Sequence, residues 1–160
     1  MPLASSAGEL DIINRLKEIV GMDVMEGDYV EDSYVPERDT NGMFVPYVLV
    51  KFNGGFPYEI DNGICGPEKD TQRASITIYV VSPDPATTRN FRDLAREKML
   101  TNFRPTDGGS LRPGNSYSFV DPDLGFHRYV QALSFSYLFN LSWTGNSMIN
   151  WLETIFNKVR

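Results

Sequence analysis

The chain has 160 residues and a formal net charge of −6, with 41% hydrophobic and 22% charged residues. This length is enough for one domain with its own core, and the composition excludes a chain that is disordered throughout. The acidic balance disfavours a general nucleic-acid binder, and the single cysteine excludes an intrachain disulfide.

An amphipathic helix is predicted over residues 9–20. Ser6 and Glu9 have the spacing of a capping box, in which two side chains satisfy free amides of the first turn. Gly21 is typical of a residue that ends a helix. The apolar residues recur at helical spacing, which predicts a face that docks on another element. They are Leu10, Ile13, Leu16 and Val20.

Residues 22–40 form an acidic stretch. They include seven acidic residues and one basic residue, Arg38, so this stretch alone accounts for the net charge of −6. We predict a ragged strand or an extended arm here. Because an extended arm spreads its carboxylates apart, a solvated or partner-facing segment is favoured over a cation site.

Two strands are predicted on either side of a loop at 53–70 that is rich in glycine and proline. Residues 71–82 alternate most clearly, and residues 43–52 form the other strand, in which Pro46 favours an edge position or the start of pairing. The predicted core faces consist of Phe44, Val48, Val50 and Phe52 in the first strand and of Ala74, Ile76, Ile78 and Val80 in the second.

A second helix is predicted from Pro85 to about Asn102, because Asp84 can cap it and proline suits the first turn. One of its faces is basic. Since Asp93 and Glu97 dilute the cations, we favour a solvated face over a phosphate site. The cations are Arg89, Arg92, Arg96 and Lys98.

One long alternating segment, 126–143, dominates the C-terminal part. It follows a glycine-rich loop at 104–115 and a short strand predicted at 117–120, which turn residues at 121–123 close. The segment is longer than an average strand, so we expect a bulge or a protrusion beyond the sheet. One parity is aromatic, and we expect core burial to explain most of it and a subunit contact to explain the excess. The aromatic residues that share this parity are Tyr129, Phe135, Tyr137, Phe139 and Trp143.

The predicted order of helix, strands, helix, strands and helix is typical of the α+β class. With one strand–helix–strand crossover, a doubly wound parallel fold is disfavoured. We expect an antiparallel or mixed sheet with the first two helices packed on one face, plus a C-terminal amphipathic helix that begins at Asn146 or Ser147. Residues 1–160 are predicted to form a single domain, with its core at about 9–142 and a helical extension at 143–160.

Motifs for catalysis are nearly absent. Cys65 and His127 are the only cysteine and histidine, too few for a usual zinc site. They would have to meet in space to act as a nucleophilic pair, and a loop thiol with a strand histidine is the favoured interpretation. Asp121 and Asp123 could be paired acids, but Asp-Pro-Asp is ordinary turn chemistry. We therefore predict no catalytic residue, no metal site, no cofactor and no enzymatic activity.

The remaining features favour association with other protein surfaces. The chain up to residue 85 holds 15 acids and 6 bases, whereas the rest holds 6 acids and 9 bases. This polarity suits head-to-tail contacts, which close into a ring when the rotation permits. The candidate interface residues are Asp28, Glu31, Asp32, Arg89, Arg92, Arg96, Arg104, Tyr137, Trp143 and Trp151.

The order of elements over about residues 9–142 is a further signal. A leading helix at 9–20 precedes strands at 44–50 and 74–81, a helix through 91–95, and a long last strand ending at 135–141. This order resembles that of the tail terminator (tail completion) proteins of long-tailed bacteriophages. The resemblance is a pattern of elements without a short diagnostic motif. The helix after Trp143 and the loops at 53–70 and 104–115 depart from it.

The resemblance implies a non-enzymatic structural protein of the virion, assembled in the host cytoplasm. Such proteins form a homohexameric ring on the head-proximal end of the tail tube, stop polymerisation of the tube protein, and offer a surface to head connector and neck proteins. DNA passes through the ring without specific binding, and residues 22–40 are a candidate for an acidic lining, with an outward arm equally compatible.

No membrane contact is expected, because no apolar run approaches the roughly 18 residues that span a bilayer and no secretory leader is evident. The alternative to a terminator is another neck or head-completion adaptor, or a small α+β binding module without catalytic activity.

Overall fold

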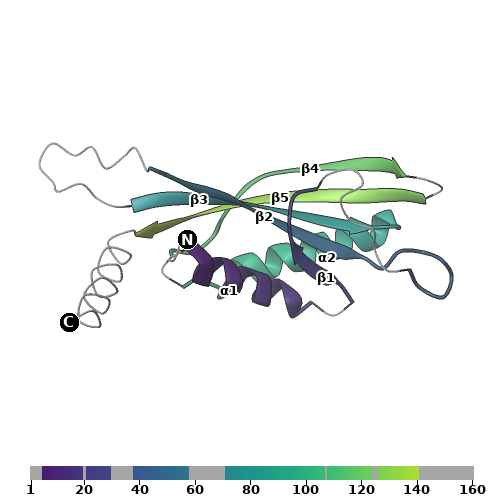
Figure 1. Cartoon of the computed structure of the whole chain (residues 1–160), viewed down its shortest axis with the longest axis horizontal. Coiled ribbons are helices and arrows are strands. Elements are labelled where there is room, and N and C mark those ends of the chain that lie inside the picture. Colours follow the sequence, from purple (N-terminus) through teal and green to yellow (C-terminus); the bar gives the residue numbers. More distant parts are fainter. Residues whose placement is uncertain are drawn as a thin grey trace, which may run out of the picture.

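The computed structural model describes residues 5–19, 21–29, 38–57, 71–106, 108–123 and 126–140. Its elements are α1 (Ser5–Lys17), β1 (Asp23–Glu26), β2 (Tyr47–Pro57), β3 (Thr71–Ser82), α2 (Pro85–Leu100), β4 (Arg112–Asp123) and β5 (Phe126–Asn140). The strands form a five-stranded sheet in the order β1-β2-β3-β5-β4 (Figure 1). β1 is parallel to β2, and the other neighbouring strands are antiparallel. The chain therefore has the predicted α+β class with a mixed sheet.

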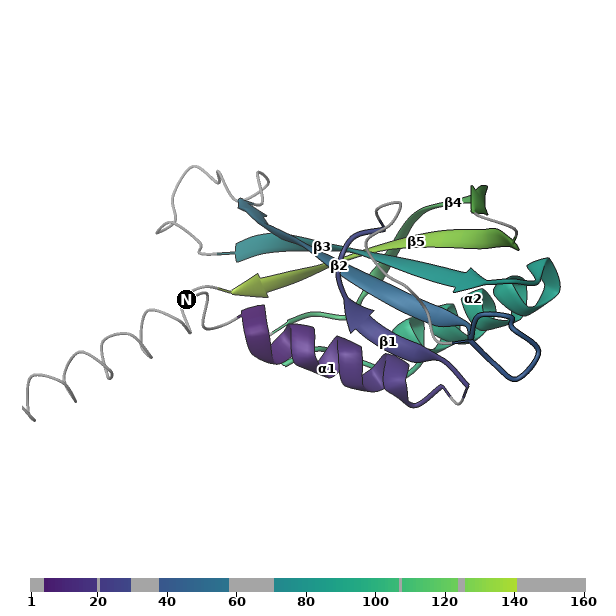
Figure 2. The same cartoon turned by 45° about the vertical axis from the view of Figure 1, so that its right-hand side comes forward.

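Both helices cover the same face of the sheet, as Figures 1 and 2 show. The strand β3 has the bounds that alternation predicts, and its predicted core face points toward the helices. The main core joins α1 and α2 to the strands β1, β2, β3 and β5. Its most buried members include Ile12 and Leu16 of α1, Ala95 and Met99 of α2, Val48 and Val50 of β2, Ile76, Ile78 and Val80 of β3, and Leu133 and Phe135 of β5.

The start of α2 is fixed by Asp84. Its carboxylate accepts hydrogen bonds from the backbone N–H of Thr87 at 2.7 Å and from the Thr87 hydroxyl at 2.8 Å. The N–H bond stabilises the charged carboxylate and lowers the pKa of Asp84. Pro85 occupies the first turn. The predicted cap and the predicted N-terminal proline are both confirmed.

The helix α1 differs from its prediction at its beginning. It already includes Ser5, so Ser6 lies inside the first turn and the predicted capping box is wrong. After the helix, Gly21 has a φ of 87°, a left-handed conformation that glycine adopts at little steric cost. The chain then enters β1.

A second, smaller core lies on the sheet face opposite the helices, and we call it the back-face core. Phe44 is 4% exposed there, with its ring centroid 6.1 Å from that of Tyr47. The prediction that Phe44 shares a face with Val48 and Val50 is wrong, because β2 begins only after Pro46 and strict alternation does not reach back to Phe44. The buried members of the back-face core are Phe44, Tyr47, Leu49, Tyr79, Val81, Val130 and Ala132.

The hairpin of β4 and β5 is longer than predicted. β4 runs through residues 121–123, which lie in the strand instead of closing it as a turn. The bulge expected within 126–143 is not seen in the pairing of β5 with β3; the register shift of the hairpin lies in β4 instead, between Pro113 and Ser116. The long last strand β5 keeps one register with β3 from Tyr129 to Asn140. Its length is therefore matched by β3.

Part of the predicted loop at 104–115 is packed against α1 and β5. The N–H and hydroxyl of Thr106 donate to the carboxylate of Asp11, at 2.8 Å and 2.5 Å. The N–H of Gly109 donates to the carbonyl of Leu138 at 2.7 Å. Gly108 and Gly109 therefore lie beside β5, before β4 begins. They cover the end of the main core.

Residues 58–70 and 141–160 lie outside the described residues. They include Cys65 and the predicted C-terminal helix, which stays a prediction. In the part of the chain that the structure describes, no helix is both long enough and apolar enough to cross a membrane.

The chain is expected to lose stability at alkaline pH. Burial raises the pKa of Tyr137 to about 12, with a smaller contribution from the carboxylates of Glu9 and Asp11. Burial also raises the pKa of Tyr29 and Tyr79. These phenols stay neutral in the folded chain but ionise near pH 10 when unfolded, so their stabilisation is complete below about pH 10 and is lost as the pH rises through the folded values.

Urea unfolding from about pH 8 to about pH 12 measures this loss. The substitution Tyr137→Phe removes one of the three phenols and should make the decline shallower. An unfolding free energy that stays constant over the whole range would contradict the prediction.

Candidate functional site

Three of the residues considered for catalysis, Asp121, Asp123 and His127, lie in the hairpin of β4 and β5. His127 is exposed, and its ring lies edge-on to Tyr129 with centroids 6.4 Å apart. Asp121 accepts a hydrogen bond from the Tyr29 hydroxyl at 2.5 Å, which gives it a structural partner. Cys65 lies outside the described residues. Among the residues that are described, no group of three or more His, Cys, Asp and Glu side chains could hold a metal ion.

The acidic stretch begins on the sheet. Its first residues form β1, and Asp28 then makes an ion pair with Lys51 of β2, which lowers the pKa of the Asp28 carboxyl. The next residue, Tyr29, packs edge-on against Phe119 and hydrogen-bonds to Asp121 of β4. The beginning of this stretch is therefore tied across the back of the sheet, from β2 to β4. Asp28 is a predicted interface residue, and its carboxylate already has a partner within the chain, Lys51.

Further along the same stretch, Asp39 organises a tight turn. Its carboxylate accepts from the backbone N–H groups of Asn41 and Met43, at 2.8 Å and 3.0 Å. Gly42 supports the turn with a φ of 80°. This turn delivers Phe44 to the back-face core. Glu31 and Asp32 lie outside the described residues.

Among the described strands, β1 is the last at one edge of the sheet, and this edge is acidic. The N–H groups of Asp23 and Gly27 donate to carbonyls on the β2 side, at 3.4 Å and 3.0 Å. Because backbone groups of successive strand residues point to opposite sides, those of Val24 and Glu26 face away from β2. The side chains of Asp23 and Glu26 are exposed at this edge on opposite faces of the sheet, Asp23 on the face of Met25 and Glu26 on the face of Val24. We call these two residues the acidic edge.

The strand β4 forms the opposite edge. Its residues 112–118 are all exposed, and Tyr117 and Val120 are among the most exposed large apolar side chains that the structure describes, at 51% and 50%. Pro113 and Pro122 lack the N–H that a neighbouring strand would need at their positions. Proline limits open-ended strand addition at an edge, so contacts by side chains are favoured here.

The helix α2 has two chemically different sides. On the side toward α1, Lys98 makes an ion pair with Glu18 at 2.9 Å, and Arg15 donates to the Lys98 carbonyl at 3.2 Å. The other side presents arginines at the spacing of one helical face. They are Arg89, Arg92 and Arg96, which we call the arginine flank.

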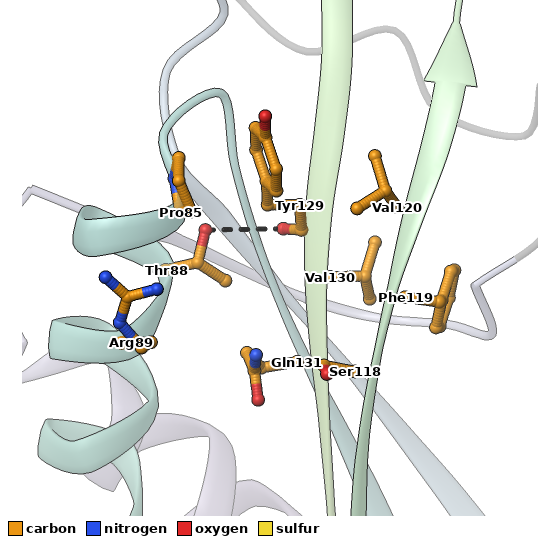
Figure 3. Close-up of a pocket in the computed structure, with 9 residues that line it drawn as sticks. All are labelled: Pro85, Thr88, Arg89, Ser118, Phe119, Val120, Tyr129, Val130 and Gln131. Atoms are coloured by element: carbon orange, nitrogen blue, oxygen red, sulfur yellow. Dashed lines mark hydrogen bonds between the residues drawn. The ribbon is translucent and has the colours of Figure 1, made fainter.

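Arg89, the first residue of the arginine flank, lines a groove of about 250 Å³ between the start of α2 and the strands β4 and β5 (Figure 3). Thr88 of α2 lies across it from Tyr129, whose carbonyl accepts from the Thr88 hydroxyl at 3.4 Å. Residues from all three elements line it: Pro85, Thr88, Arg89, Ser118, Phe119, Val120, Tyr129, Val130 and Gln131. The groove marks the part of β4 that the helices leave uncovered.

The structure divides the predicted interface residues into three groups. Arg89, Arg92 and Arg96 come together on one side of α2, and Arg104 is exposed beyond its end. Tyr137 is 4% exposed and belongs to the main core, so it offers no surface to a partner. Trp143 and Trp151 lie outside the described residues.

Sequence reasoning missed the acidic edge, the groove and the back-face core. In the sequence, the carboxylates at 23 and 26 are part of a longer acidic stretch, and nothing singles them out. The groove cannot be predicted because it depends on which strand the helices leave uncovered. No protein-family model matches the chain, and no curated protein matches its sequence.

Proposed function

We propose that this chain is a structural protein of the virion that assembles into a ring and acts as a tail terminator. The observation that carries the proposal is the pair of open sheet edges, β1 and β4, with acidic residues beside one and arginines beside the other. A surface on one side that complements a surface on the opposite side makes head-to-tail contacts, and these generate a ring when the rotation closes. The order of elements, which resembles that of tail terminators, supports the same assignment.

In this role the ring, expected to be a homohexamer, caps the head-proximal end of the tail tube. It stops addition of tube subunits and presents its other face to the head connector and neck proteins. DNA passes through the central hole, where acidic residues repel phosphates and keep the passage free of specific binding. The protein would be found in the neck of the virion after assembly in the host cytoplasm.

Two measurements test the proposal. Native mass spectrometry and negative-stain electron microscopy of the purified chain should give a closed ring with a central hole. In a polymerisation assay with the tail-tube protein of the same phage, adding the chain should limit tube length and place a cap at one end. A chain that stays monomeric at high concentration and leaves tube growth unchanged would refute the proposal.

A further inference from the structure

We infer that the contact between neighbouring copies joins the acidic edge of one copy to the arginine flank of the next. This inference rests on the proposed function, since it names the residues that would close the ring. The occupant of the arginine flank is therefore a second copy of this chain.

The acidic edge is free to make such a contact. Other carboxylates of the N-terminal part have partners within the chain: Glu18 pairs with Lys98, Asp28 with Lys51, and Asp11 with Thr106. Asp23 and Glu26 are exposed and make no ion pair with any residue that the structure describes. Two exposed carboxylates that make no ion pair with the described residues can meet cations from another copy.

The arginine flank supplies matching cations. Arg89 and Arg96 are exposed, and neither makes a hydrogen bond or close ion pair within the described residues. Arg92 contacts the adjacent Asp93 at 2.8 Å and keeps 29% of its side chain exposed. The guanidinium group binds carboxylates through two parallel N–H donors, which gives such contacts direction as well as strength.

The two surfaces meet only between copies. β1 and β4 are the opposite edges of the sheet, and Arg89, the first residue of the arginine flank, lines the groove at the β4 edge. A symmetric dimer through two β4 edges would bring the two arginine flanks toward each other, and like charges oppose it. Head-to-tail contact instead places an acidic surface on a basic one at every junction.

Charge reversal on each surface tests the inference. The variants are Asp23→Lys/Glu26→Lys and Arg89→Glu/Arg96→Glu, and each should raise the concentration needed for assembly by about 10-fold or more. The matched control is Lys17→Glu, which reverses an exposed charge of α1 that belongs to neither surface and should assemble like the unmodified chain. Native mass spectrometry over a concentration series gives the result.

Mixing the two variants makes the test specific. The first variant has two basic surfaces and the second has two acidic surfaces, so only alternating copies form complementary junctions. The equimolar mixture should recover assembly with equal numbers of both chains. Recovery also proves that each variant is folded, and circular dichroism of each variant alone checks this independently.

The outcomes separate this inference from the proposed function. If the unmodified chain forms rings and both reversal variants assemble at the same concentration, the inference is wrong and the ring function stands. If both variants lose assembly while folded and the mixture does not recover it, the pairing of these two surfaces is wrong. If the unmodified chain never assembles, the proposed function fails and the inference fails with it.

Discussion

Replacing Phe44 by alanine is expected to lower the free energy of unfolding by about 3–5 kcal/mol. Phe44 is 4% exposed and packs in the back-face core, where its ring lies against Tyr47. Truncation removes the buried ring and leaves a cavity beside strands that are already fixed in the sheet, so the site cannot collapse to fill it. Urea unfolding followed by circular dichroism measures the loss.

The neighbouring substitution Val45→Ala is the control for Phe44→Ala. Val45 is only half-buried and is not part of either core, so its truncation should cost much less. Equal and small losses for the two variants would show that the back-face core does not hold the chain together. A large loss for Phe44 alone would show that the turn at Asp39 serves to anchor the acidic stretch.

Replacing Gly108 by alanine is expected to cost about 1–3 kcal/mol of unfolding free energy through overpacking. A Cβ atom at this position would lie 2.6 Å from Cδ2 and 2.9 Å from Cε2 of Tyr137. The Tyr137 ring is 4% exposed and held within the main core, so it cannot swing away without disturbing its neighbours. The melting temperature and the urea midpoint should both fall.

The adjacent glycine provides a matched control for this substitution. A Cβ atom at Gly109 would lie 3.6 Å from the Leu138 carbonyl oxygen, an ordinary van der Waals contact. The Gly109→Ala variant should therefore stay within about 0.5 kcal/mol of the unmodified chain. If the two alanine variants unfold at the same urea concentration, the close approach of residue 108 to Tyr137 is not present in solution.

The parts of the fold that could be predicted are those that local chemistry determines. Strand β3 alternates clearly, with one face buried from Ala74 onward and both faces buried from Ile78 to Ser82, so its bounds follow from its sequence. The start of α2 follows from Asp84 and Pro85, because capping and a fixed proline φ act within one turn. The packing of both helices on one face follows from their apolar stripes, although Leu10 of the stripe predicted for α1 is 56% exposed and Ile12 is buried in the core.

The errors arose where a distant contact overrides a local pattern. Phe44 follows the parity of β2 in sequence, yet it packs on the other face because Pro46 separates it from the strand. Residues 121–123 have the composition of a turn, but pairing with β5 and the hydrogen bond from Tyr29 hold Asp121 in an extended strand. That partner is 92 positions away along the chain, so no local pattern contains it.

The candidate site could be predicted only in part. The spacing of the basic residues of α2 predicts one basic face. That Lys98 pairs with Glu18, on the other side of the helix from the arginines, depends on where α1 docks. Tyr137 was assigned to an interface because an aromatic stripe fits both a core and a contact surface. Only the position of α1 and of residues 104–109 above β5 places it in the core.

The sheet order also has a consequence for synthesis on the ribosome. β1, β2 and β3 are neighbours in space and leave the ribosome first, whereas β5 completes the other side of β3 only after α2 and β4 have been made. Until then β3 presents a free 12-residue edge rich in β-branched residues. Such an edge is a template for pairing between nascent chains, so prompt arrival of β5 protects the newly made protein from aggregation.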